Sequence, residues 1–393
     1  MKITELTNER TRETSIILLL NEILNQAIDK KSSDIHFEPY SEHLRIRFRI
    51  DGLLHEITKI NLQMGQRFSS RLKIMANLDI AEKRRPQDGR FTLKLENNQN
   101  YNCRLSTCPT IFGEKLVVRI LNPIDTAPNI NQLGLNEKER DIFYQHIKSP
   151  QGMILVTGPT GSGKTTTLYS AINTLNETTK NISTTEDPVE IHLDGINQVE
   201  VNYKIGLDFA SILRTFLRQD PDIMMIGEIR DLETAEIAIK AAHTGHLVLA
   251  TLHTNSATAT ITRLLNMRIP TFNLATALKL IISQRLVRKL CPHCKKPQTL
   301  PGKALVENNL EENSKTFTAH GCKNCHQGFI GRTAIFEMLP ITRNISNMIM
   351  NGCGTVSIEK KLEQQKYISI REAALNKVRM GITSLEEINR VVA

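Results

Sequence analysis

The sequence predicts an α/β protein with three parts: a core built on a parallel sheet, a small α+β domain before it, and a metal-binding insertion. Apolar runs typical of buried strands alternate with helical stretches, as in a parallel sheet covered on both faces. These runs lie at residues 152–157, 181–185, 223–227 and 246–252. Before them, residues 44–50 alternate between apolar side chains and arginines, and after them residues 288–330 are rich in cysteine, proline and lysine.

Length and composition indicate a soluble globular protein. With 393 residues, 40% of them hydrophobic and 23% charged, the chain has material for two or three domains. No stretch approaches the ~18 consecutive apolar residues of a membrane span, so we expect a cytoplasmic protein. The net charge of +9 permits attraction to anionic partners. The basic residues are scattered and tryptophan is absent, which disfavours nucleic acid as the main ligand.

The small α+β domain is expected over residues 1–121. Helix patterns at 14–31 and 62–78 and strand patterns at 44–50, 91–96, 101–108 and 115–121 make up its elements. The first strand ends at Asp51-Gly52, a hairpin turn signal, and its arginine row is more typical of a solvated face than of a site. Residues 122–131 hold two prolines and no apolar period, which indicates a linker. The second domain, 132–393, starts with a helix at 136–147 and ends in helices over 340–393.

The first apolar run of the second domain leads into a phosphate-binding loop. Gly158, Gly163, Lys164 and Thr165 satisfy the pattern G-x-x-x-x-G-K-[ST] between a strand and a helix. Backbone N–H groups and the helix start would hold phosphate oxygens, Lys164 would reach the β- and γ-phosphates, and Thr165 would bind Mg²⁺. A glycine-rich turn that binds nothing would not need the lysine and the hydroxyl. The predicted nucleotide-binding residues are Gly158, Pro159, Thr160, Gly161, Ser162, Gly163, Lys164, Thr165 and Thr166.

Acidic residues and histidines follow the later strands of this domain. Glu186 and Asp187 come just after one apolar run, and Glu228 comes after another. Ligands of such sheets bind outside the carboxyl ends of the strands, so we expect these acids to orient water or hold Mg²⁺. A solvated loop carboxylate is the alternative for each. His246 and His253 bracket a third strand, and either an ordinary structural role or contact with the γ-phosphate is consistent with that position.

Two C-x-x-C pairs lie in the cysteine-rich region. Cys291 and Cys294 form the first pair, Cys322 and Cys325 form the second, and 27 residues separate the two pairs. Four thiolates suit a closed tetrahedral Zn²⁺ site. A redox pair or inert buried cysteines are the alternatives, and the second pair favours zinc. The neighbouring His293 and His326 are expected to be bystanders.

Together these motifs resemble the secretion ATPases that drive type II secretion and type IV pilus assembly. That family has a Walker A loop, an acidic box, a Walker B segment, a histidine box and, in its assembly branch, a tetracysteine zinc element. This sequence has GPTGSGKT, TTEDPVE, LRQDPDIMMIGEIRD, TGHLVLATLHTN, and CPHC with CKNC in the same order. SDIHFEP, RPQDGRF, CRLSTCPTIFGEKLVVRIL, GFIGRTAIFEML and GITSLEEI also match the family. The resemblance extends from about residue 14 to the end of the chain.

The resemblance implies roles for individual residues. Glu186 would be the catalytic carboxylate and Glu228 the Walker B acid, with His246 and His253 near the γ-phosphate. Arg104 and Arg119 would reach the phosphates across a domain or subunit boundary, which makes hydrolysis depend on domain position. Further arginines match positions of nucleotide contact and interface pairing: Arg214, Arg218, Arg230 and Arg332.

The resemblance also implies a fold, partners and a location. It predicts a RecA-like core after a PAS-like domain, a homo-hexamer using ATP, Mg²⁺ and Zn²⁺, and peripheral association with the inner face of the inner membrane through a platform protein. Many type II secretion members carry an additional N-terminal domain that docks on a membrane partner, and this sequence has only about a dozen residues before the match. The zinc element disfavours the retraction branch. A nucleic-acid translocase and a nucleotide-binding regulator are the alternative functions.

Overall fold

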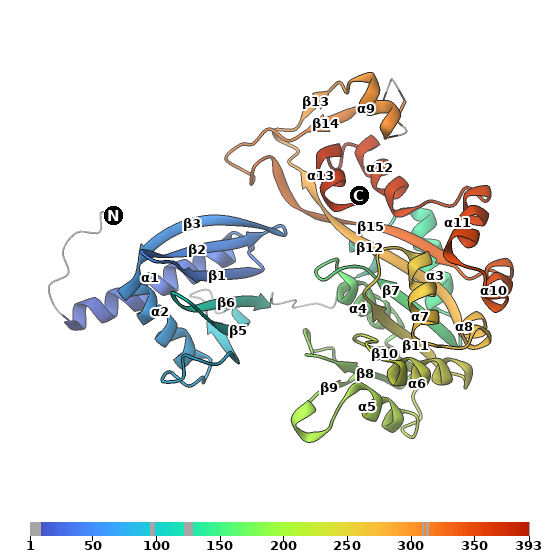
Figure 1. Cartoon of the computed structure of the whole chain (residues 1–393), viewed down its shortest axis with the longest axis horizontal. Coiled ribbons are helices and arrows are strands. Elements are labelled where there is room, and N and C mark those ends of the chain that lie inside the picture. Colours follow the sequence, from blue (N-terminus) through green and yellow to red (C-terminus); the bar gives the residue numbers. More distant parts are fainter. Residues whose placement is uncertain (1–8, 95–98, 122–128, 309, 312–313, 393) are drawn as a thin grey trace. The chain divides into compact units, whose positions relative to one another are not determined.

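The computed structural model describes residues 9–94, 99–121, 129–308, 310–311 and 314–392. The chain forms two compact units, Met1–Asp125 and Thr126–Ala393 (Figure 1). Residues 122–128 of the predicted linker lie outside the described residues.

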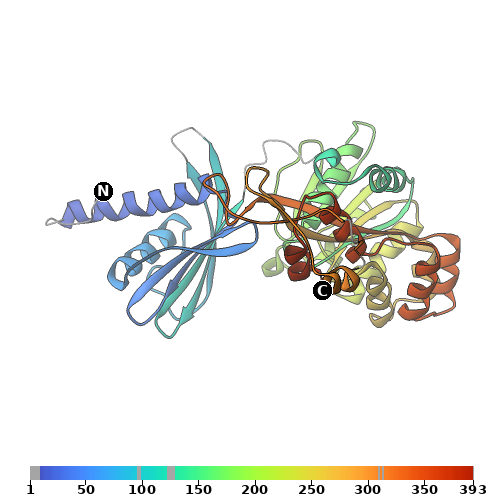
Figure 2. The same ribbon diagram turned by 90° about the horizontal axis from the view of Figure 1, so that it is seen from above.

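The first unit is a six-stranded antiparallel sheet with two helices. Its elements are α1 (Glu9–Asp29), β1 (Asp34–Pro39), β2 (His43–Ile50), β3 (Leu53–Asn61), α2 (Leu62–Met75), β4 (Gln87–Lys94), β5 (Asn100–Thr110) and β6 (Gly113–Leu121). The strand order is β3-β2-β1-β6-β5-β4. Figure 2 shows the two helices beside this sheet. This arrangement agrees with the predicted α+β class.

Alternation along β2 fixes which face of this sheet is buried. Leu44, Ile46, Phe48 and Ile50 are at most 3% exposed and belong to the core of this unit. The turn after β2 uses positive φ at Asp51 (48°) and Gly52 (88°), and glycine adopts such values without a Cβ penalty. The predicted strand and turn are both confirmed.

The arginines of β2 pair with acids on the opposite face of the sheet. Arg47 donates to both carboxylate oxygens of Glu38, at 2.8 and 2.7 Å, and Arg45 lies 3.0 Å from the same group. Burial would raise the pKa of Glu38, but these guanidinium groups and Lys115 lower it to about 2. The row is therefore an ion-pair network, which the alternating pattern alone does not predict.

The second unit is built on a seven-stranded sheet of order β15-β12-β7-β11-β10-β8-β9. Its strands are β7 (Gly152–Thr157), β8 (Ile182–Glu186), β9 (Asn197–Glu200), β10 (Ile223–Ile226), β11 (Leu247–Leu252), β12 (Leu278–Leu290) and β15 (Phe329–Pro340). Six run parallel, and β15 is antiparallel to β12. The predicted parallel sheet is confirmed.

Helices cover both faces of this sheet, as two separate apolar clusters show. One cluster involves η1 (Ile130–Gln132), α3 (Glu137–Ile147) and α4 (Lys164–Leu175). The other involves α5 (Phe209–Phe216), α6 (Leu232–His243), α7 (Ala257–Asn266), α8 (Thr271–Ala277), α10 (Arg343–Met350) and α11 (Thr355–Gln364). A short turn, η2 (Tyr203–Ile205), precedes α5. Within the described helices, none is long and apolar enough to span a membrane.

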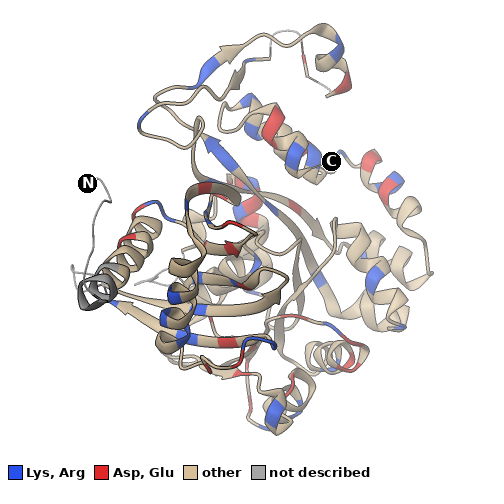
Figure 3. Ribbon diagram, turned by 60° about the vertical axis from the view of Figure 1, so that its left-hand side comes forward, with Lys and Arg blue, Asp and Glu red and all other residues tan. Residues whose placement is uncertain are grey.

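The long β12–β15 pair is the main element that the sequence analysis missed. Residues 288–330 are predicted as an insertion, yet β12 runs through Arg288 to Leu290, and Phe329 begins β15. Between the two strands lie β13 (Lys296–Gln298), α9 (Gly302–Glu307) and β14 (Thr316–Thr318). The terminal helices α12 (Ile370–Arg379) and α13 (Leu385–Val391) pack on the pair. Lys, Arg, Asp and Glu are spread over both units rather than gathered by sign (Figure 3).

Candidate functional site

The phosphate loop joins β7 to α4 at the carboxyl edge of the parallel sheet. Every residue of β7 is buried, and Gly158, Gly161 and Gly163 have φ of 147°, 77° and 87°. These values are open to glycine and strained for residues with a Cβ. Lys164 is 8% exposed. Its Nζ donates to the carbonyls of Gly158 (3.0 Å) and Pro159 (3.1 Å), so the ammonium is held against the loop that is expected to bind phosphate.

Neighbouring strands bring a charged cluster to the same edge of the sheet. Glu228 follows β10, and its carboxylate contacts the guanidinium of Arg230 and lies 3.6 Å from Nε2 of His253, which follows β11. Arg230 lies 3.7 Å from Asp187, which follows β8. Parallel strands end at one edge, and therefore acids and cations that are far apart in sequence meet there.

The charges of this cluster influence Lys164 and His253. Burial lowers the pKa of Lys164, and Arg285 lowers it further, whereas Glu228 and Glu190 raise it. Burial, Lys164 and Arg230 lower the pKa of His253 against the opposing charge of Glu228. A lowered pKa favours neutral His253 near pH 7, a form whose imidazole keeps one N–H donor.

Glu186 is placed differently from the other acids. It is 3% exposed, and its carboxylate accepts from the hydroxyls of Tyr169 and Thr184 and from the amide of Gln198. These donors come from α4, β8 and β9, so the Glu186 carboxylate links three elements of the second unit by hydrogen bonds. Glu190, four residues later, is exposed, and its backbone N–H donates to the Tyr169 hydroxyl at 3.3 Å.

Several predicted site residues do not meet at the phosphate loop. His246 precedes β11, where its backbone carbonyl accepts from the N–H of Gly152 at the start of β7. It therefore lies at the opposite edge of the sheet from His253, which makes contact of both with one γ-phosphate geometrically inconsistent. Arg214 pairs with Glu233 of α6, and Arg218 donates to the Arg214 carbonyl. Arg332 is exposed on β15.

Arg104 and Arg119 belong to the first unit, where they are cross-strand partners on β5 and β6. Arg119 is 59% exposed and lies 3.0 Å from Asp34, and Arg104 is 42% exposed and lies 3.6 Å from Asp88. An exposed ion pair such as Arg104–Asp88 contributes only about 0–1 kcal/mol, so Arg104 is held weakly. Arg119 instead donates to a buried carboxylate, that of Asp34.

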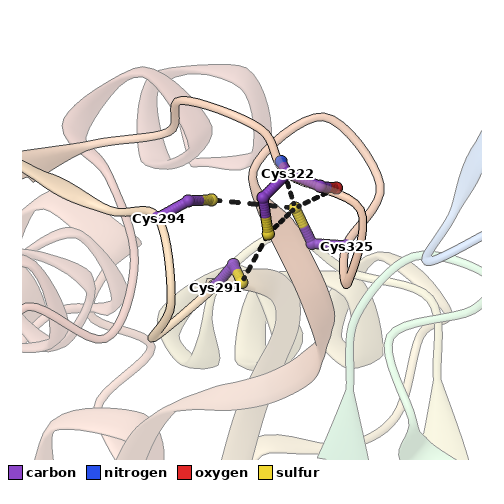
Figure 4. A group of neighbouring side chains, drawn as sticks. All are labelled: Cys291, Cys294, Cys322 and Cys325. Carbon is purple, nitrogen blue, oxygen red and sulfur yellow. Dashed lines mark hydrogen bonds between the residues drawn. The ribbon is translucent and has the colours of Figure 1, made fainter.

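The four-cysteine cluster lies at the end of the β12–β15 pair. The Sγ atoms of Cys291, Cys294, Cys322 and Cys325 all lie within 4.8 Å of one another, and Figure 4 shows them facing a common centre. Three of the sulfur–sulfur distances are 3.6, 3.7 and 3.9 Å. A tetrahedral ion with Zn–S bonds of about 2.3 Å requires about 3.8 Å between sulfurs. The thiols thus fit a metal site, and the described residues contain no other such group.

Sequence reasoning missed two residues that the fold connects to the candidate site, Glu190 and Tyr169. Glu190 is part of the quoted TTEDPVE motif, but its proximity to Lys164 depends on the path of the chain after β8. Tyr169 reads as an apolar position of α4, and only the fold shows that its hydroxyl contacts the acidic segment. The signal available in the sequence was the hydroxyl of Tyr169 among the apolar residues on the buried face of α4.

The strand–loop–helix arrangement and the acids at the same sheet edge define a P-loop nucleotide-binding protein. The sequence profile of the family described as "Type II/IV secretion system protein" matches residues 9–390. The chain is 50% identical to the type IV pilus assembly ATPase PilB of Pseudomonas aeruginosa, over 96% of this chain and 68% of that protein. It is 45% identical to the type II secretion system ATPase E of Vibrio cholerae, over 98% and 76%. The chain belongs to this family of secretion and pilus ATPases.

A solved structure supports the same conclusion. The pilus retraction motor PilT with bound ADP superposes with a TM-score of 0.61 at 27% identity, covering 93% of this chain and 95% of that one. The predicted family and the predicted fold class are confirmed. Membership of an ATPase family supports an ATP-hydrolysing enzyme, and the four-cysteine cluster indicates a metal site.

Proposed function

We propose that this protein is a Mg²⁺-dependent ATPase that powers assembly of a type IV pilus or a type II secretion pseudopilus. It works as a hexamer at the cytoplasmic face of the inner membrane, where it moves a platform protein. The observation that carries this proposal is Lys164 held in a phosphate loop beside Glu228 and His253, in a chain with 50% identity to a pilus assembly ATPase.

In this proposal the phosphate loop, Gly158 to Thr166, binds the triphosphate of ATP. Lys164 would leave the loop carbonyls for the β- and γ-phosphates, and Thr165 and Glu228 would hold Mg²⁺, which would neutralise charge on the phosphates. Arg230 and His253 already contact Glu228, which supports a γ-phosphate contact for both. His246, Arg214, Arg218 and Arg332 lie away from this cluster, and we assign them to contacts between neighbouring copies.

Two acids compete for the role of catalytic carboxylate. The family resemblance implies Glu186, the last residue of β8, as the catalytic carboxylate, but three side-chain donors use its oxygens. Glu190 is exposed, and its charge acts on Lys164. Activation of water by Glu186 requires release of its buried carboxylate from Tyr169, whereas Glu190 is a solvent-exposed residue whose charge acts on Lys164. We therefore propose Glu190 as the acid that activates water, with Glu186 as the rival to test.

Glutamine substitutions at the two positions distinguish these roles. Loss of a general base lowers turnover about 10²- to 10⁴-fold without unfolding the protein. We expect this result for Glu190→Gln, and we expect a lowered melting temperature with a smaller loss of turnover for Glu186→Gln. The reverse pattern returns the catalytic role to Glu186. Lys164→Ala is the reference variant, and full ATP turnover in Lys164→Ala would reject the nucleotide site itself.

The arginines of the first unit supply the proposed coupling between hydrolysis and movement. The side chains of Arg104 and Arg119 are 42% and 59% exposed, so we propose that their guanidinium groups can bind the phosphates of a nucleotide. Hydrolysis then depends on the position of the first unit. Arg104→Ala and Arg119→Ala should each lower turnover while leaving ADP affinity nearly unchanged. Turnover at the wild-type rate in both variants would reject this coupling.

Zinc is the metal we propose for the four-cysteine cluster, because sulfur–sulfur distances of 3.6 to 3.9 Å match its tetrahedral geometry. Metal analysis of freshly purified protein should give one equivalent of zinc per chain. Mass photometry with ATP should give six chains per particle.

A nucleic-acid translocase is the alternative function. Strong stimulation by single-stranded DNA that falls steeply with salt would favour it.

A further inference from the structure

We propose that Gln284 is a positioning residue that holds both ends of the phosphate loop in place from the neighbouring strand. This inference rests on the proposed nucleotide site and adds a residue to it. Gln284 lies on β12, which pairs in parallel with β7, the strand that leads into the loop. Ser283 is the register partner of Thr157, so Gln284 stands level with the first residue of the loop.

The side chain of Gln284 reaches the far end of the loop and the start of α4. Its Oε1 accepts from the hydroxyl of Thr167 at 2.7 Å, and Thr167 also donates to the carbonyl of Gly163. The amide Nε2 lies so close to Gly163 that a Cβ built there would be 2.9 Å from it. Gln284 thus limits the space and the conformation available to the residue just before Lys164.

The main chain of Gln284 lies against the near end of the loop. A Cβ added to Gly158 would be 2.5 Å from the Gln284 carbonyl oxygen. The guanidinium of Arg285 donates to that same oxygen at 3.0 Å and to the carbonyl of Asn255 at 2.8 Å. The Gln284 peptide is therefore fixed from the other side by an arginine that also reaches the segment after His253.

The surroundings of Gln284 are unusual for an amide with no function. Leu280, Ile281 and Ile282 precede it on β12 and are fully buried, and Gln284 itself is 2% exposed. A buried amide costs free energy unless it is hydrogen-bonded, so an apolar residue would serve packing alone. The amide lies at the position along β12 that is next to Gly158 and Gly163 of the phosphate loop. Its contacts with the two loop glycines and with Thr167 favour control of loop geometry over simple packing.

Substitution of Gln284 by leucine tests this role. Gln284→Leu removes the amide beside Gly163 and leaves the Thr167 hydroxyl with only the Gly163 carbonyl as acceptor. It should weaken binding of ADP about tenfold, the scale of one lost buried hydrogen bond. Binding is measured by titration calorimetry of the full chain with ADP and Mg²⁺. Ser283→Ala is the matched control, because Ser283 is equally buried on β12 but bonds to Asn255. It should bind ADP as the wild type does.

A double variant separates positioning from stability. Thr167→Val combined with Gln284→Leu removes both polar partners, which restores a satisfied apolar contact and much of the stability. We expect its melting temperature to return toward the wild-type value while ADP affinity stays about tenfold weaker. Wild-type affinity in either the Gln284→Leu protein or the double variant would overturn the proposal, and the double variant decides alone if Gln284→Leu fails to fold. Failure of the nucleotide site itself would show instead as unchanged ADP binding in Lys164→Ala.

Discussion

The hydrogen bond between Tyr169 and Glu186 gives the most direct test of how the acidic segment is attached to the phosphate-loop helix. Tyr169 is fully buried on α4, and its hydroxyl donates to a carboxylate that is 3% exposed. Burial and the charge of Glu186 raise the pKa of the phenol, which keeps it a donor at every pH used for assays. Tyr169→Phe removes only this hydroxyl and leaves the ring in place.

The expected loss of stability can be derived from the contacts. A hydrogen bond to a charged group contributes about 1.5–3 kcal/mol. Glu186 keeps the Thr184 and Gln198 donors after the substitution, so we expect a loss near the lower end, ~1.5 kcal/mol. The Glu190 N–H also loses its acceptor, and for that reason the effect should extend to the segment after β8.

Hydrogen exchange as a function of denaturant measures this loss where it occurs. Peptides covering β8 and the start of α4 report the local unfolding free energy in the full chain. Tyr144→Phe is the matched control, because the Tyr144 hydroxyl has no hydrogen bond within the described part of the chain and its ring contacts Lys148. A double-mutant cycle with Glu186→Gln isolates the pair. A coupling energy below ~0.5 kcal/mol would refute the view that Glu186 is held by Tyr169.

Two further predictions concern acid stability and metal removal. The pKa of Glu38 falls from 4.5 to about 2 on folding. The contribution of the ionised Glu38 carboxylate to the free energy of unfolding is therefore present above pH 4.5 and is lost as pH falls toward 2. Glu38→Gln should therefore melt about 4 °C or more below the wild type at pH 6, and this gap should narrow steadily below pH 4.5; a constant gap would contradict the shift. Removal of metal with a chelator should raise hydrogen exchange in residues 291–325 while β7 and α4 stay protected, since structural zinc contributes folding energy to its own site. Unchanged exchange around the cysteines after complete metal loss would show that the cluster needs no metal.

Local patterns were sufficient to predict the parallel sheet and the phosphate loop. Apolar runs at 152–157 and 223–227 correspond to β7 and β10, and the alternation at 44–50 corresponds to β2. These patterns follow directly from which faces are buried. The four cysteines were likewise predictable, because two short pairs must meet if they bind one ion.

The strand pair β12–β15 and the true setting of Glu186 could not be read from the sequence. β12 is buried on both faces over most of its length, so its residues show no period of two, and Arg285 and Gln284 interrupt its apolar run. Glu186 has the sequence position of a catalytic acid, yet Tyr169 and Gln198 come from segments 17 and 12 residues away. Long-range side-chain contacts of this kind depend on the completed fold rather than on local pattern.

The continuity of β12 from the phosphate loop to the cysteines has a mechanical consequence. Cys291 follows the last residue of β12 and lies seven positions after Gln284, which corresponds to roughly 23 Å of extended chain. β15 pairs with β12 from Leu280 to Arg288 and again at Leu290, with a register shift between Arg288 and Leu290, whereas β7 pairs with β12 only from Leu278 to Ser283. Force applied at the cysteines is thus borne by many ladder hydrogen bonds that must break together, and the N–H groups of Leu290 and Cys291 are also bonded, to the carbonyls of Ile382 and Gly328. β12 therefore links the cysteine end of the strand pair directly to the strand segment beside the phosphate loop.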